Sequence, residues 1–117
     1  MKKQLIELAK KKGFVSAVIG KSVESKLSNK PFYYLWLCEL QQWFRDNHNI
    51  DVDVVRDIEV YHHNEKRWIV KVSNFNNVKK FGTHLRVIEH PEHYHYPDFK
   101  LYEEALEKGL YEALKLL

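Results

Sequence analysis

The chain has 117 residues, of which 44% are hydrophobic and 30% are charged, and its net charge is +3. This balance predicts one domain over residues 1–117 and excludes a disordered chain. The single cysteine, Cys38, excludes a disulfide framework within one chain and favours a reducing compartment. No run approaches the roughly 20 apolar residues of a membrane helix, and the N-terminal segment lacks the pattern of a secretory signal. We therefore expect a cytoplasmic protein without membrane contact.

The charge of the chain is unevenly distributed. Residues 1–30 hold eight lysines and two acidic residues, whereas residues 31–117 hold 11 basic and 14 acidic residues. Such a basic segment is typical of proteins that bind an acidic partner or nucleic acid. Lys10, Lys11 and Lys12 are therefore candidate partner-binding residues. The alternative interpretation is a solvated helix face.

The first part of the chain predicts two helices. Residues 2–12 place Leu5, Leu8 and Ala9 on one face, and Gly13 follows where a helix end is expected. Residues 14–20 fit either a strand or a buried coil, and residues 21–31 read as a polar connector. Residues 1–30 together form the N-terminal helix and connector that precede the core. A longer helix then runs from Pro31 to about His48. Its apolar positions follow helical spacing: Tyr33, Trp36, Leu37, Leu40, Trp43 and Phe44.

Period-two alternation then predicts strands over residues 50–61, 67–73 and 84–90. Pairing Val60 with Trp68 puts the apolar side chains of the first two strands on one face. The same register places Asp57 opposite Lys71, a favourable cross-strand pair. Residues 74–83 read as a loop.

Residues 98–117 predict a final amphipathic helix that Asp98 caps. Leu106, Leu110, Ala113 and Leu117 form the expected core stripe. Gly109 lies between small residues one turn away on each side, which favours close approach to another element. The predicted fold of residues 31–117 is thus α+β: a three-stranded antiparallel sheet with two amphipathic helices on one face (α-β-β-β-α), preceded by a short N-terminal helix.

This order of elements over residues 31–117 resembles the double-stranded-RNA-binding domain. That family contacts RNA with basic residues at the start of its last helix. The matching stretch, residues 97–104, reads PDFKLYEE and is acidic instead. The resemblance therefore implies the fold without the RNA-binding motif.

Two further segments, YYLWLCELQQWFRDNHNIDVDV and YEEALEKGLYEALKLL, resemble small uncharacterised proteins encoded by phages and prophages of gut bacteria. They cover about a third of the chain. The resemblance implies a cytoplasmic accessory protein that acts on a host component, and it implies no particular biochemical activity.

The segment HPEHYHYP, residues 90–97, carries three histidines and two tyrosines. His90, His93 and His95 are candidate ligands for Zn²⁺. Their spacing matches no standard zinc module, and an extended chain would send His90 to the opposite side from the other two. The alternative is a structural or surface loop in which Tyr94 and Tyr96 are exposed contacts for a partner.

These observations lead us to expect a non-enzymatic interaction protein with no cofactor. Its partner would be an unidentified protein, such as a host factor, or a second copy of the chain. Nucleic-acid or nucleotide binding through the lysine-rich N-terminus is the second hypothesis, and it predicts strong salt dependence. A small metal-binding protein that uses the histidines of residues 84–95 is the third.

Overall fold

The computed structural model describes residues 1–17, 27–56, 67–76, 78–81, 84–87 and 92–117. The described helices are α1 (Lys2–Lys11), α3 (Lys30–His48) and α4 (Tyr102–Lys115). The described strands are β1 (Ile50–Arg56), β2 (Trp68–Asn74), β3 (Val78–Phe81), β4 (His84–Val87) and β5 (Glu92–Phe99).

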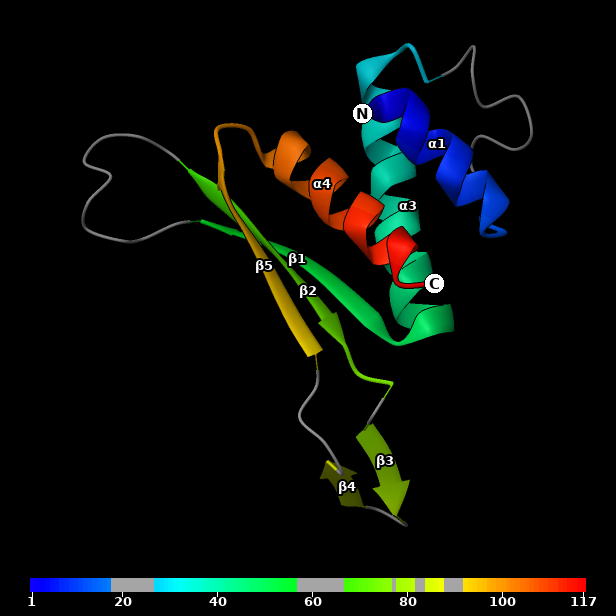
Figure 1. Ribbon diagram of the computed structural model, residues 1–117. Helices are drawn as coiled ribbons and strands as arrows, with labels where there is room; N and C mark the ends of the chain where they lie inside the picture. Colours follow the sequence, from blue (N-terminus) through cyan, green and yellow to red (C-terminus); the bar gives the residue numbers. More distant parts are fainter. Residues whose placement is uncertain (18–26, 57–66, 77, 82–83, 88–91) are drawn as a thin grey trace.

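Strands β1, β2 and β5 form an antiparallel sheet in the order β1-β2-β5. The three helices lie on one side of this sheet (Figure 1). Helix α4 packs directly on the sheet, α3 contacts β1 and α4, and α1 packs on α4. The predicted α+β class, with two amphipathic helices on one sheet face and a short helix before them, is confirmed.

Helix α3 follows its predicted boundaries closely. Pro31 stands in the first turn, where a missing backbone N–H costs no helical hydrogen bond. Asn49 ends the helix in a left-handed conformation with φ of 54°. The predicted stripe is buried except for the half-buried Trp43. Apolar periodicity was sufficient here because the whole stripe faces a single core.

The register of the first hairpin differs from the prediction. Trp68 lies opposite Arg56 rather than Val60, and Asp53, not Asp57, lies opposite Lys71. The apolar side chains nevertheless keep their predicted face, because the two registers differ by an even number of residues. Both registers offer Lys71 an acidic neighbour, so charge pairing did not distinguish them.

The third strand of the sheet was assigned to the wrong segment. Residues 84–87 do form a strand, β4, but it pairs with β3 in a separate two-stranded sheet that extends beyond one end of the main sheet (Figure 1). The third strand is β5, which contains most of the histidine-rich segment that was predicted as a loop. Its alternation of His and Tyr is the period-two pattern of a strand, and the shift in register beside Val70 accommodates Pro97.

Helix α4 begins at Tyr102 rather than at Asp98, because residues 92–99 belong to β5. Leu101 occupies the N-cap position and makes no side-chain capping bond, so the predicted cap at Asp98 is wrong. The predicted burial of Leu117 is also wrong. Leu117 is exposed, and Leu114 is buried in the core instead.

The predicted close approach at Gly109 is confirmed. A Cβ atom on Gly109 would lie 2.3 Å from Val70 Cγ2 and 2.8 Å from Val52 Cγ1. These separations are far inside van der Waals contact, so only glycine lets α4 lie this close to β1 and β2. Val52 and Val70 are themselves fully buried in the core cluster that joins the sheet to α1, α3 and α4.

We predict that Gly109→Ala lowers the free energy of unfolding by about 1–2 kcal/mol, measured by chemical denaturation. The clash with Val70 and Val52 outweighs the gain of about 1 kcal/mol that alanine brings to a helix. In a Val70→Ala background the cost of Gly109→Ala should fall, because the nearest methyl group is gone. Stabilisation by Gly109→Ala in the original background would contradict the packing argument.

Candidate interaction surface around helix α1

Helix α1 presents opposite chemistry on its two faces. Leu5 and Ala9 are buried in the core, as the sequence pattern predicted, and Ile6 is buried with them, whereas Leu8 is only half-buried. Lys3, Gln4, Glu7, Lys10 and Lys11 are exposed on the outer side. This outer row is the basic surface expected from the sequence, and two of the three candidate lysines, Lys10 and Lys11, lie exposed on it. Lys12 is partly exposed at the end of the helix.

The segment after α1 packs against α3 and so anchors α1 to it. Gly13 adopts φ of 94°, a backbone conformation that side-chain-bearing residues rarely take, and turns the chain. Phe14 then packs edge-on against Trp36 and Trp43, with ring centroids 5.6 and 5.5 Å apart. Residues 14–17 form no strand. The part of the predicted strand-or-coil segment that is described is therefore coil, with Phe14 and Ser16 buried.

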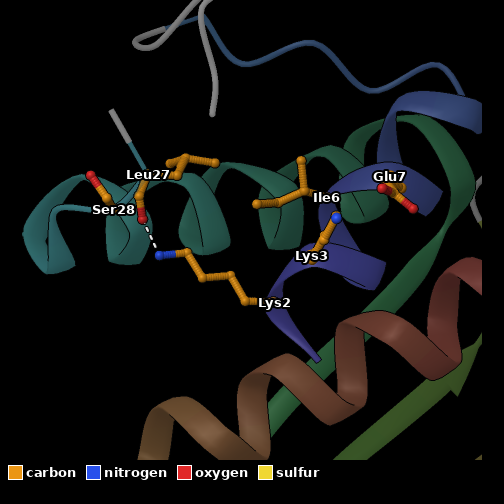
Figure 2. A pocket seen from close by; sticks show the side chains of 6 residues that line it. All are labelled: Lys2, Lys3, Ile6, Glu7, Leu27 and Ser28. Atoms are coloured by element: carbon orange, nitrogen blue, oxygen red, sulfur yellow. Dashed lines mark hydrogen bonds between the residues drawn. The ribbon is translucent and has the colours of Figure 1, made fainter. Parts of the chain in front are cut away.

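A hollow of about 380 Å³ opens between α1 and the turn that precedes α3. Its lining consists of Lys2, Lys3, Ile6, Glu7, Leu27 and Ser28. Figure 2 shows Ile6 from α1 and Leu27 from the turn flanking the hollow, with charged side chains around them. The interior is apolar and the rim is polar, which is the usual composition of a binding pocket.

We call this hollow the Lys2–Leu27 hollow. Two contacts hold the Lys2 side chain on one side of it. Its ammonium group donates a hydrogen bond to the backbone carbonyl of Leu27 (Figure 2). The same group lies 4.6 Å from the centre of the Tyr33 ring, a cation–π distance. Lys2 thus joins the turn before α3 to α1, while its neighbour Lys3 is exposed.

Two further hollows border α1 elsewhere. One, of about 280 Å³, lies between α1 and the end of α4 and includes Leu8, Lys11 and Tyr111. The other, of about 490 Å³, lies at the start of α1 and includes Lys2, Phe99 and Glu107. Helix α1 is therefore a ridge with hollows along its sides rather than a flat helix face.

Glu107 on α4 is a half-buried acid beside the start of α1. Burial raises the pKa of its carboxyl above the ordinary value, and the carboxylate of Glu104 adds to this rise. The Tyr33 hydroxyl and the positive charges of the N-terminus and of Lys2 oppose the rise only in part. Burial, together with the charge of Glu107, likewise raises the pKa of Tyr33.

The two candidate tyrosines lie on β5, away from the lysines. Tyr94 and Tyr96 lie opposite Val72 and Val70, so they share the sheet face that the helices cover. Tyr96 is half-buried against the core, and Lys108 Nζ lies 5.5 Å from its ring centre. Tyr94 is 36% exposed. Of this pair, Tyr94 has the more accessible ring.

The candidate metal ligands are only partly described. His93 and His95 lie opposite Ser73 and Lys71 on the outer sheet face, whereas His90 lies outside the described residues. His93 Nδ1 is 2.8 Å from Ser73 Oγ. Within the described part of the chain, no three His, Cys, Asp or Glu side chains are grouped as a metal ion would require. Metal binding by His90, His93 and His95 stays a prediction.

Sequence reasoning found the basic face of α1 but missed the hollow beside it. Leu27 and Ser28 stand in the polar stretch that was interpreted as a connector, and a lone leucine there carries no periodic signal. Only folding brings this turn against Lys2 and Ile6.

Comparisons with models of protein families, with curated proteins and with solved structures found no match. In the described part of the chain, no helix is long and apolar enough to cross a membrane.

We predict opposite pH effects for two acids on α4. Because the pKa of Glu107 is raised, its stabilising contribution is full below the ordinary value of 4.5 and is lost as the pH rises through its folded value. Glu107→Gln should therefore raise the melting temperature at neutral pH, and the difference should vanish in acid.

Glu112 is the matched control. Burial opposes its ionisation, but Lys108 at 2.8 Å and Lys115 at 3.2 Å outweigh burial and lower its pKa. Its contribution is present above 4.5 and is lost as the pH falls, so Glu112→Gln should lower the melting temperature at neutral pH and not in acid. Thermal melts across this range check both signs; equal shifts for the two variants would contradict them.

Proposed function

We propose that this chain is a non-enzymatic interaction protein that binds a protein partner through α1 and the hollows beside it. The observation that carries the proposal is the Lys2–Leu27 hollow, which joins an apolar interior to a lysine-bearing rim. A pocket that receives one anchoring side chain and a charged rim that steers the partner are the two parts of a typical protein interface.

The wider setting of the proposal comes from the sequence. The likeness of two segments to small phage and prophage proteins supports an accessory role in which the partner is a host factor. The single cysteine, Cys38, supports a cytoplasmic site of action, since reduced thiols persist there. No cofactor enters the proposal.

Tyr94 is proposed as a second contact, separate from α1. Its ring is 36% exposed at the edge of the sheet, and tyrosine is enriched in protein interfaces because its large ring carries a polar tip. Tyr96 is the weaker candidate because its ring is half-buried and supports α4. Replacing Tyr96 would therefore change stability as well as binding.

Site-specific photo-crosslinking in the producing cells tests the proposal. A photoreactive amino acid in place of Lys11 should yield a discrete protein adduct that nuclease treatment leaves unchanged. The same amino acid in place of Lys100, an exposed lysine just before α4, is the matched control and should yield little adduct. Adding Lys3→Glu should reduce the adduct at position 11 roughly tenfold, because the charge that steers the partner is reversed.

Three results would contradict the proposal. They are equal adducts from both positions, adducts that nuclease removes, and no adduct from position 11. An adduct of two copies of this chain would identify the partner as the protein itself, and native mass spectrometry would then show a dimer.

A further inference from the structure

The Lys2–Leu27 hollow has the size and lining for a single bulky apolar group. Its volume of about 380 Å³ is near the small end of the roughly 300–1,000 Å³ range of ligand pockets. Ile6 is 7% exposed and Leu27 is 1% exposed, so both are anchored in the core and form a firm base with little surface left to bury. A group that fills the hollow would bury its own apolar surface against this base and against the carbon stems of Lys2 and Lys3, without moving the fold.

The positive charges around the hollow favour a partner whose anchoring side chain is flanked by acidic residues. Lys2 and Lys3 stand at its rim, and Lys10 and Lys11 continue the basic row along the exposed side of α1. Glu7 is the one acidic residue among residues 1–12. An acidic segment that runs along α1 would meet Lys3 at one end and Lys10 and Lys11 at the other, on either side of Glu7.

The same residues disfavour a nucleic acid. Among the described residues that line the hollow, none is an arginine or an aromatic residue on which a base would stack. A nucleic acid also carries a phosphate at every nucleotide, so one would lie near the Glu7 carboxylate. A peptide spaces its charges freely and can place a backbone N–H opposite Glu7 instead.

We infer that the Lys2–Leu27 hollow receives a large apolar side chain from an acidic segment of the partner. This inference rests on the proposed function and adds the chemical class of the partner to it. The apolar anchor supplies affinity by burial in the hollow, and the flanking carboxylates supply orientation along α1.

An NMR titration of the full ¹⁵N-labelled chain tests the inference. The probe is a short blocked peptide with one phenylalanine between glutamates. It should shift the amide signals of Lys3, Ile6, Leu27 and Ser28. The dissociation constant should be about 1 mM, as expected for a minimal ligand. A matched peptide with serine in place of the phenylalanine should bind at least roughly tenfold more weakly, because the burial of the ring is lost.

Two variants locate the binding in the hollow. Lys3→Glu should weaken the phenylalanine peptide roughly tenfold by reversing a rim charge. Ser28→Trp should abolish binding by filling the hollow from its exposed rim, while the signals of the sheet stay unchanged. Lys100→Glu, which changes the net charge as much as Lys3→Glu does, is the control and should leave binding unchanged.

Several results would overturn the inference. Equal shifts with the serine peptide would show that no apolar anchor enters the hollow. Tighter binding of a single-stranded oligonucleotide at the same signals would assign the surface to phosphate. If neither peptide causes a response but the crosslinking experiment yields a protein adduct at position 11, the apolar anchor in an acidic segment is rejected. The proposed function would then still hold.

Discussion

The contact between Gly109 and the valines of the sheet is the constraint on which the rest of the structure depends. Val70 Cγ2 and Val52 Cγ1 occupy the space that any Cβ at position 109 would need. Helix α4 can therefore lie close to β1 and β2, and its other side is left to support α1. Since α1 contacts α4, this close approach helps set the position of the lysine row, together with the packing of Phe14 on α3.

Helix α3 protects the edge of the sheet at β1. Gln41 donates a hydrogen bond to the backbone carbonyl of Val52. Arg45, one turn further on, lies 3.5 Å from Asp51 and 3.6 Å from Asp53. These contacts occupy polar groups that an exposed edge strand would offer to another chain. They also explain why β1 tolerates alternating acidic residues on its outer face. With the β1 edge occupied in this way, α1 and β5 are the better candidates for partner contacts.

The prediction succeeded where one local pattern was enough and failed where segments competed for a place. The stripe of α3, the inward face of β1 and the close approach at Gly109 were all readable, because each follows from spacing within one element. The third strand was misassigned because residues 84–87 and 92–99 both have strand character. Nothing within either segment says which one β2 will accept, since pairing depends on a neighbour distant in sequence.

The sequence by itself determined the described helices, the first two strands of the sheet and the buried side of α3 and β1, because these are set by periodicity over a few residues. It also determined that the outer side of α1 is basic. Only the tertiary structure decided the register of β1 on β2 and the choice of β5 as the third strand. It alone brought Leu27 against Lys2 and Ile6 to form a hollow. Those outcomes depend on contacts between distant residues, whose energies are settled only when the whole core packs at once.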